Sequence, residues 1–374
     1  MELDLTSDQE LLRGTAAKFM EATCPIDVVR QLGGSDTGLP ENYIRNAAEL
    51  GWFSLLVPEE IGGGSVSGHG LRDAVILAEE RGRRLQPGPF VPMNIVAAAL
   101  AAQGSDSQKA NVLPAILSGE AIATWAAADA TGSWAPGSGV SVSPTDGRFL
   151  LSGRVGLVQD AALADWFLVA ASGPEALFQF LVPSSTPGVT ILPRRTHDIT
   201  QRFALVDFDA VGLDRNALVG ESASTTDDLD RQLQVAVVLS VAETVGAIDV
   251  LFDMTRQYAI DRIAFGRPIG SFQAVKHQLA DMSLAVEAGK AIATAATRAV
   301  QAGESDAAQI ASMAKAWVGD TGIDIAQGCF QVFGGIGYTW EHDFHLFLRR
   351  ITMNSLLFGQ PDWHRERICE IHGL

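Results

Sequence analysis

Arginine, glycine and a helix-start signal come together in one segment of the chain. The stretch YAIDRIAFGRPIGSFQAVKHQLADM, residues 258–282, places Arg262 and Arg267 between two long helical patterns. Ser271 is a typical residue at a helix N-terminus, so the next helix would present free backbone N–H groups to an anion. Two guanidinium groups beside such a helix end are suited to a pyrophosphate. A helical hairpin with solvated arginines fits the pattern equally well.

Two segments nearer the C-terminus could belong to the same or another site. QVFGGIGYTWEH, residues 331–342, contains glycines that would let the backbone approach a ligand. ITMNSLLFGQPDWHRER, residues 351–367, has apolar residues at helical spacing until Gly359 and Pro361 end the pattern. Phe358 therefore belongs either to a simple helix end or to the wall of a site.

Other catalytic patterns are missing from the sequence. It contains no GxSxG, HExxH or phosphate-loop motif. His342 and His345 could share a metal ion on one helix, but two exposed helical histidines are more often surface residues. We therefore expect no metal site.

Three regions of different composition must position these residues. Residues 1–120 carry helical patterns, residues 121–224 carry short alternating runs between turn residues, and residues 225–374 carry long helical patterns. The sequence predicts an α+β multidomain fold with an N-terminal helical domain and a C-terminal four-helix-type bundle. Between them we expect an antiparallel β barrel or sandwich of about seven strands.

The charge and cysteine content exclude several classes of protein. With 27 Lys and Arg against 44 Asp and Glu, the net charge of −17 disfavours nucleic acid and anionic membranes as partners. The 3 cysteines form no CxxC motif, and the N-terminal residues lack the apolar core of a secretory signal. Apolar stretches such as VAVVLSVAETVGA look too short to span a membrane. We expect a cytoplasmic protein without membrane insertion.

The two C-terminal motifs carry a family resemblance. YAIDRIAFGRPIGSFQAVKHQLADM and QVFGGIGYTWEH closely resemble two signatures of the acyl-CoA dehydrogenase family of flavoenzymes, and ELGWFSLLVPEEIGGG resembles an early segment of that family. The resemblance spans almost the whole chain, and the family has the same α–β–α order. It implies a homotetramer or related dimer-based assembly that binds FAD between subunits, with an electron-transfer flavoprotein as the electron acceptor.

The resemblance also implies a reaction and a set of cofactor contacts. A carboxylate would take the α proton of an acyl-CoA thioester while the flavin takes the β hydrogen as hydride. Among the cofactor-binding residues, Arg262, Phe265 and Gln273 match positions that contact the ADP half of the flavin of a neighbouring subunit. Gln331, Gly334 and Gly335 match the opposite side of that site.

Members of the family carry the glutamate that acts as catalytic base at one of two positions, and this sequence has no carboxylate at either. The glutamate of its Glu-Gly-Thr motif matches Phe358, and the alternative position on the first long bundle helix matches Ala236. Phenylalanine has no lone pair with which to accept a proton. Glu243, about 10 Å further along the same helix, is the nearest substitute, although a buried glutamate paired with an arginine is the more common arrangement.

The region that would hold the flavin ring also departs from the family. AAADATGSWAPGSG stands where the family has Thr-Glu-Pro-Gly-Ala-Gly-Ser, with Asp129, Gly132 and Ser133 as partial matches. A second motif, Trp-Ile-Thr, is replaced by LVQ at residues 157–159, which ends in Gln159. The resemblance therefore implies that the ADP half of the site is kept and the ring half is eroded.

Three hypotheses follow from these matches and departures. The first is an active dehydrogenase with an unusual base such as Glu243 or Asp129. The second is a subunit of a heterotetramer in which a homologous chain supplies the base and the intact flavin pocket. Actinobacterial relatives that oxidise steroid side chains as CoA thioesters are built in this way, and the WEHD and PxWHR segments resemble their smaller subunits. The third is a flavin-free protein that binds CoA esters or scaffolds a partner. The missing base favours the second hypothesis over the first, and the hairpin motif disfavours the third.

Overall fold

Short helices fill the N-terminal part of the chain. The structure is a computed structural model that describes residues 5–35, 37–145, 147–221 and 225–374. The rings of Phe19, Tyr43 and Phe90 surround the buried Trp52 in edge-to-face contacts and form the centre of this part. Its α-helices are α1 (Ser7–Thr23), α2 (Ile26–Leu32), α3 (Tyr43–Glu49), α4 (Gly70–Arg83), α5 (Phe90–Gln103), α6 (Asp106–Asn111) and α7 (Leu113–Leu117).

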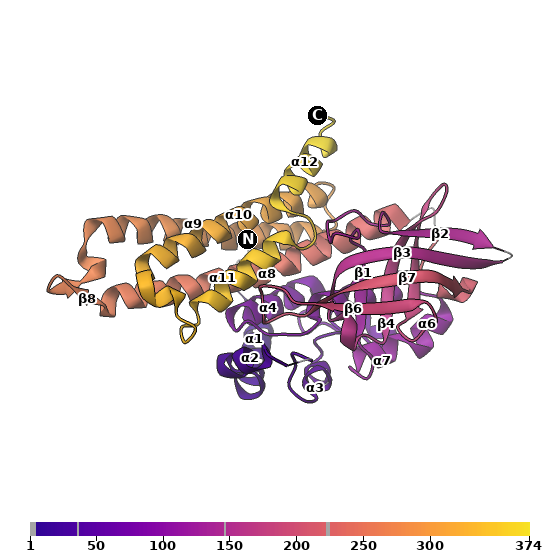
Figure 1. Cartoon of the computed structure of the whole chain (residues 1–374), viewed down its shortest axis with the longest axis horizontal. Helices are drawn as coiled ribbons and strands as arrows, with labels where there is room; N and C mark the ends of the chain where they lie inside the picture. Colours follow the sequence, from indigo (N-terminus) through magenta and orange to yellow (C-terminus); the bar gives the residue numbers. More distant parts are fainter. Residues whose placement is uncertain (1–4, 36, 146, 222–224) are drawn as a thin grey trace.

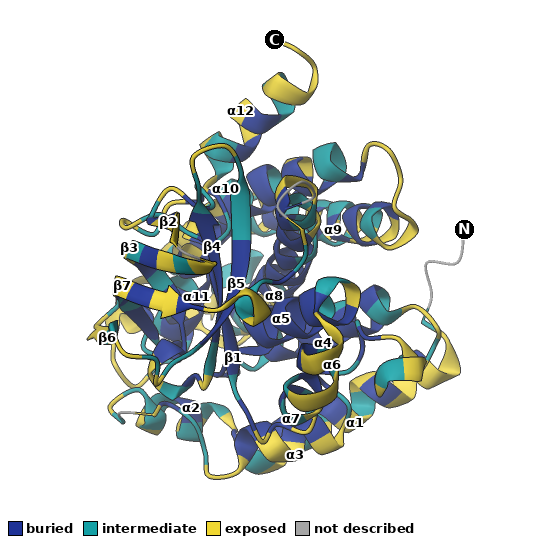
Figure 2. Cartoon of the chain, turned by 90° about the vertical axis from the view of Figure 1, so that its right-hand side faces the viewer, coloured by how far each residue is buried: buried dark blue, intermediate teal, exposed yellow. Residues whose placement is uncertain are grey.

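Helix α5 connects the three parts of the molecule. Its sequence, FVPMNIVAAALAAQ, is apolar on every side, and a helix of this kind is stable only when it is covered all round. It packs against the first strand of the sheet and against the first long helix of the bundle. Figure 2 shows its buried residues at the centre of the end-on view.

The middle of the chain forms one hydrogen-bonded sheet with the order β1-β4-β2-β3-β7-β6, in which β5 also pairs with β4. The expected antiparallel pairing holds for β2–β3, β3–β7, β4–β5 and β6–β7. Strand β1 instead lies parallel to β4, because the chain crosses over through the β2–β3 hairpin between them. The strands are β1 (Ala123–Ala126), β2 (Val140–Thr145), β3 (Arg148–Gln159), β4 (Trp166–Ser172), β5 (Leu177–Pro183), β6 (Val189–Arg194) and β7 (Phe203–Leu213).

Long helices follow the sheet and run along the longest axis of the molecule (Figure 1). The sheet lies at one end of this bundle, and a small hairpin, β8 (Ile263–Ala264) with β9 (Arg267–Pro268), lies at the other. The last helix stands out from the body of the protein (Figure 1). The helices are α8 (Thr225–Asp261), α9 (Gln273–Ala302), α10 (Ala307–Phe333), α11 (Phe344–Leu356) and α12 (Pro361–Ile371).

Helix α8 is more apolar than its broken sequence pattern suggested. In the part of the chain that the structure describes, it is the helix long and apolar enough to cross a membrane by length and composition. However, 78% of its most apolar window is buried inside the protein, chiefly against α4 and α10. It is therefore the central helix of the core.

Candidate functional site

The connection between α8 and α9 is an exposed tip at the far end of the bundle (Figure 1). Phe265 is 96% exposed and adopts a left-handed conformation with φ of 53°. Arg262 and Arg267 are exposed beside it, and the Arg267 guanidinium lies 4.1 Å from the centroid of the Phe272 ring. An exposed phenylalanine in a strained backbone conformation is costly for an isolated chain. The tip therefore presents an exposed aromatic ring and two exposed guanidinium groups to its surroundings.

The N-terminus of α9 differs from the prediction in one respect. Its N-cap residue is Phe272, and no side chain caps the helix. Ser271 belongs to a preceding 3₁₀ turn, which moves it one position out of register, and its Oγ is buried without a hydrogen-bond partner. The prediction of Ser271 as the N-cap is wrong. The first N–H groups of α9, next to the exposed Gln273, keep the anion-binding character expected of an uncapped helix end.

The structure brings the second C-terminal motif to the same end of the bundle. Tyr258, at the end of α8, contacts Phe333, at the end of α10, with ring centroids 4.9 Å apart. Gly334 follows with φ of 61° and ψ of −138°, a conformation open only to glycine. A Cβ added at Gly334 or Gly335 would meet nothing within 4 Å, so the packing of this chain does not demand glycine at Gly335. The surface next to the exposed Gln331 therefore has room for a group from outside.

Phe358 lies in the turn between α11 and α12 and belongs to an aromatic cluster. Its ring stacks on Trp125 of β1 at a centroid distance of 6.1 Å, and Trp125 contacts Trp134 at 4.9 Å. Both tryptophans are buried. We call Trp125, Trp134 and Phe358 the aromatic stack. At the position that matches the base of the family, the chain has packed rings.

Apolar packing also extends to the positions that match the ring-binding motifs. Leu157 and Phe358 pack with the buried Phe203, Met353 and Leu357. A Cβ placed on Gly132 would approach Cγ of Leu157 to 2.5 Å, so Leu157 fills the space beside the 129–133 loop. Gln159 donates from its side-chain amide to the carbonyl of Gly88 at 3.3 Å, which fixes it to the start of α5. Leu157 and Phe358 thus take part in apolar packing at the positions that match the ring-binding motifs.

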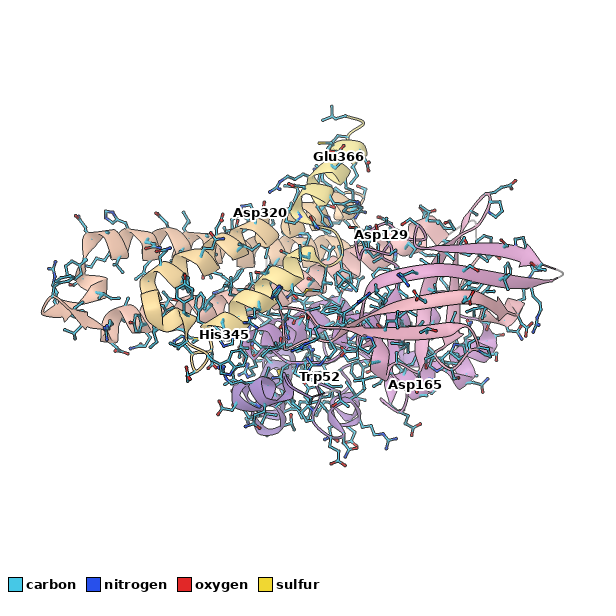
Figure 3. All side chains as sticks on the ribbon, viewed as in Figure 1. Trp52, Asp129, Asp165, Asp320, His345 and Glu366 are labelled. Carbon is cyan, nitrogen blue, oxygen red and sulfur yellow. The ribbon has the colours of Figure 1, made fainter. Side chains whose placement is uncertain are left out.

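Asp129, a possible base, is occupied within its own loop. Its carboxylate accepts hydrogen bonds from the backbone N–H and hydroxyl of Thr131 and from the N–H of Ser133, at 2.7 to 2.9 Å. Desolvation raises the pKa of Asp129, but these hydrogen bonds outweigh it and hold the pKa below its ordinary value. The residue lies where the sheet meets the helical bundle (Figure 3). A carboxylate stabilised in this way is a poor proton acceptor.

Glu243 and Ala236 are both buried. Glu243 accepts a hydrogen bond from Arg350, whose side chain is completely buried and also donates to Asp198 at 3.0 Å. Desolvation lowers the pKa of Arg350, but attraction to Glu243 and Asp198 outweighs it and holds the pKa above its ordinary value. The more common arrangement of a buried glutamate, pairing with an arginine, is the one observed here.

Sequence reasoning did not identify Arg350 as a structural centre. Besides the two carboxylates, its guanidinium donates to Thr200 and to the carbonyls of Leu85 and Gln86. It therefore joins α11 to α8, to a loop of the β part and to the link before α5. Its only signal in the sequence is its place on the buried face of a helix.

Two buried basic side chains behind the Phe358 turn were also missed. The Nζ of Lys315 donates to the carbonyl of Asn354, and His364 Nε2 lies 2.9 Å from the carbonyl oxygen of Phe358. Burial lowers the pKa of Lys315 to about 7. Burial, with a smaller contribution from the nearby Lys315, lowers the pKa of His364 to about 3. His364 is therefore neutral, and it donates its Nε2 proton to the turn.

The histidines considered for a metal do not form a ligand set. His345 stacks on Trp340 with ring centroids 4.8 Å apart, and its Nε2 lies 3.2 Å from Arg30. Within the described ranges, no group of three His, Cys, Asp or Glu side chains is placed to hold a metal ion.

Comparisons with known proteins agree with this architecture. The model of the acyl-CoA dehydrogenase N-terminal domain matches residues 6–120, and that of the C-terminal domain matches residues 229–371. The acyl-CoA dehydrogenase IpdE2 of Mycolicibacterium smegmatis is 29% identical over 358 residues, which is 96% of each chain.

Two solved structures of protein complexes are also similar. The ChsE4–ChsE5 complex from Mycobacterium tuberculosis contains a chain that is 25% identical, with a TM-score of 0.90 over 100% of this chain and 99% of that chain. A variant of the Tcur3481–Tcur3483 steroid ACAD contains one that is 26% identical, with a TM-score of 0.87 over 98% of both chains. The family models match on both sides of the sheet, and the fold and the motifs at the bundle end agree with them. The chain belongs to the acyl-CoA dehydrogenase family.

Proposed function

We propose that this chain is the subunit of a heteromeric acyl-CoA dehydrogenase that lacks the catalytic base and works beside a homologous chain that supplies it. The carrying observation is the contact of Phe358 with Trp125, which puts an aromatic pair at the position matching the base of the family. The assembly would catalyse FAD-dependent α,β-dehydrogenation of an acyl-CoA thioester. This is the oxidoreductase activity of the family.

The contacts of the other residues that could act as the catalytic base also support this proposal. Ala236 carries no ionisable group, and Glu243 is held by Arg350 in the core. The loop hydrogen bonds of Asp129 lower its pKa, which weakens it as a base. A homomeric enzyme would have to abstract the α proton with one of these residues, and none is placed or tuned to do so.

The two halves of the site differ in how well their residues would fit FAD. Members of the family bind FAD, whose flavin accepts a hydride from the substrate. The ring half does not fit in this chain, because Leu157 and the aromatic stack fill it. The ADP half fits: exposed guanidinium groups, the uncapped start of α9 and the open glycine surface can receive a pyrophosphate. This chain would thus complete the flavin site of its partner with Arg262, Phe265 and Gln273.

The similar complexes suggest the substrate class and the wider context. One of them is named as a steroid ACAD, and each is named after two different chains. By analogy we infer a steroid-type CoA thioester as the substrate and a heterotetramer as the assembly. An electron-transfer flavoprotein is the inferred acceptor, and the cytoplasm is the inferred location.

The visible absorption spectrum tests the proposal. The chain purified alone is expected to be colourless and inactive with acyl-CoA thioesters. Co-purified with the homologous chain encoded beside it, it is expected to be yellow, with one FAD for each pair of chains. A yellow homomeric preparation that reduces an electron acceptor with acyl-CoA would overturn the proposal. So would the failure of every neighbouring homologue to form a complex.

A further inference from the structure

Two buried side chains of opposite charge lie where the sheet meets the N-terminal helices. Asp160 directly follows β3 and is 2% exposed, and Arg81 lies near the end of α4 and is 3% exposed. Neither belongs to the aromatic stack. Each has a polar atom that the packing of the chain leaves without a partner, although such atoms are rare in folded proteins and call for an explanation.

The backbone of Asp160 is fixed, but its carboxyl group is not paired. Its N–H donates to the carbonyl of Arg202 at 2.9 Å, and its φ is 50°. Within the described chain, its Oδ2 is buried and has no hydrogen-bond partner. A carboxyl oxygen in this position would be strongly destabilising as a free anion.

Arg81 holds the link between α4 and α5. Its Nη2 donates to the carbonyls of Gln86, Pro87 and Gly88 at 3.3, 3.0 and 3.1 Å. Its Nε is buried and has no partner among the described residues. One N–H of the guanidinium group is therefore left over, while the rest of the group fixes the backbone that leads into α5.

Shared contacts bring the two side chains to the same place. The carbonyl of Gly88 accepts from Arg81 and also from the side-chain amide of Gln159, at 3.3 Å. Gln159 is the neighbour of Asp160 in the chain. Arg81 is also the charged group with the largest effect on the pKa of Asp160. A small movement of the guanidinium group would thus exchange the link for the carboxyl group.

The charges around Asp160 favour such an exchange. Three guanidinium groups act on its carboxyl group, those of Arg81, Arg202 and Arg350. Arg350 is balanced by two carboxylates. Within the described ranges, neither Arg81 nor Arg202 forms an ion pair, and both donate to backbone carbonyls. Two buried or half-buried cations therefore lack a counter-ion that Asp160 could supply.

The other titratable groups beside Arg81 keep their protons. Burial raises the pKa of the Cys24 thiol to about 11, and it raises the pKa of the Tyr43 hydroxyl well above its ordinary value. Asp160 is thus the group of this neighbourhood that can change its charge near neutral pH.

The observed arrangement is that of a protonated acid. Burial raises the pKa of Asp160 to about 7, although the guanidinium groups oppose this shift. An ionised carboxylate in the same surroundings would draw a guanidinium group onto itself. Arg81 instead faces the carbonyls of the link. The proton on Asp160 keeps the two groups apart.

We propose that Asp160 and Arg81 form a proton-controlled interlock between the sheet and the N-terminal helices. While Asp160 carries its proton, Arg81 holds the link of residues 86–88. When the proton passes to solvent, the carboxylate pairs with Arg81, the guanidinium group leaves the link carbonyls, and the start of α5 loosens. The interlock needs neither a flavin nor a partner chain, so it does not rest on the proposed function.

Infrared spectroscopy of the full chain tests the proton on Asp160. A protonated carboxyl group has a C=O band separate from the bands of carboxylates. We expect such a band that disappears as the pH rises through about 7 and that is missing from Asp160→Asn at every pH. Asp209→Asn, which removes an exposed carboxylate of β7, is the control and should keep the band. Identical spectra of the wild type and Asp160→Asn below pH 7 would overturn the proposal.

Hydrogen exchange of the link tests whether this proton controls the backbone. After correction for the intrinsic rate at each pH, amides of residues 84–91 should exchange several-fold faster above pH 7 than below it. In Asp160→Asn they should stay protected at both pH values, because the amide cannot ionise. Unchanged protection in the wild type, or the same loss of protection in Asp160→Asn, would overturn the proposal.

Arg81→Met tests the identity of the cation. Without this guanidinium group the carboxylate loses its main stabilising charge, so the Asp160 band should persist to a higher pH. Arg84→Met is the control: Arg84 pairs with Glu21 and Glu80, and its loss should leave the midpoint unchanged. Equal midpoints for the two variants would exclude Arg81 as the partner. Should Arg81→Met fail to fold, the exchange comparison with Asp160→Asn still decides.

Discussion

Phe358 and Trp125 stack at an interplanar angle of 26°, and this contact joins the α11–α12 turn to the first strand of the sheet. The turn has two successive residues in the left-handed region, Phe358 with φ of 58° and Gly359 with φ of 94°. His364 holds the carbonyl of Phe358, and a Cβ on Gly359 would approach Trp363 to 2.7 Å. The backbone of the turn is thus fixed by groups other than the Phe358 ring, so the shape of the turn and the chemistry of residue 358 are separable.

Replacing Phe358 by glutamate is therefore expected to restore neither flavin binding nor dehydrogenase activity in the chain alone. Trp125, Trp134 and Leu157 would still fill the ring half of the site. The variant Phe358→Glu should remain colourless and inactive in a dye-reduction assay, and Phe358→Leu is the apolar control. A yellow, active Phe358→Glu homomer would show that the missing carboxylate is the only defect.

Glu243→Gln is expected to destabilise the protein without the signature of a lost base. It leaves the buried Arg350 with Asp198 as its remaining carboxylate, and breaking a buried ion pair costs about 3–5 kcal/mol. Urea denaturation measures this loss. Glu287→Gln, which removes a partner of the surface Lys290, should cost less than about 1 kcal/mol. A large fall in kcat of the assembled enzyme with unchanged stability would instead mark Glu243 as catalytic.

Arg262→Ala is expected to lower the FAD affinity of the complex. A charge-assisted hydrogen bond contributes about 1.5–3 kcal/mol, so the loss should be roughly tenfold to a hundredfold. Equilibrium dialysis against FAD gives the affinity directly. Arg256→Ala removes another exposed arginine of α8, one paired with Asp253 at 3.2 Å, and should leave FAD affinity intact. Equal FAD affinities for the two variants would show that the hairpin is not part of the cofactor site.

Lys315→Met is expected to stabilise the protein, with a pH dependence set by the lowered pKa. Burial lowers the pKa of Lys315 from 10.5 to about 7, so between these values the unfolded chain holds a proton that the folded chain does not. The native protein therefore gains stability as pH rises through this window. The gain from Lys315→Met should be largest below the window and shrink across it. A constant difference between the two proteins in denaturation at several pH values would contradict this expectation.

His364 is expected to make the Phe358 turn sensitive to acid. Its pKa is lowered from 6.5 to about 3, so the unfolded chain takes up a proton that the folded chain refuses as pH falls through this range. Stability contributed by neutral His364 is present above the range and is lost within it. Denaturation midpoints measured at several pH values should follow this loss in the native protein. In His364→Gln the acid-dependent part of the loss should be smaller.

Local sequence signals predicted the order of helices and strands because each signal depends on neighbouring residues. The periodicity of the α8 segment and the turn residues between strands are of this kind. Pairing and packing are not local. The parallel β1–β4 pairing depends on where a crossover goes, and the Trp125–Phe358 contact joins residues far apart in the sequence. Neither residue shows a pattern that predicts the contact.

The predictions for the candidate site also depend on whether the sequence signal is local. Family motifs predict cofactor contacts at the exposed arginines and the glycine surface, because such motifs are short segments, and this role stays a prediction. The N-cap of α9 was misplaced by one residue, since a 3₁₀ turn around Ser271 cannot be told from a helix start by composition. Lys315 shows a visible signal, a lone lysine among alanines in ASMAKAWVG, but only the fold reveals that Asn354 is its partner.

The apolar composition of α8 has a consequence for synthesis of the protein. Until its neighbours pack on it, this helix offers the cell a segment that membrane-insertion machinery and other unfolded chains can both recognise. Helix α4, one of its main covers, is made earlier and can shield it at once, whereas α10 is made later. A nascent chain halted between α8 and α10 should therefore aggregate or engage chaperones far more than one halted before α8. Ribosome-stalled fragments of defined length would show at which chain lengths the nascent protein aggregates or binds chaperones.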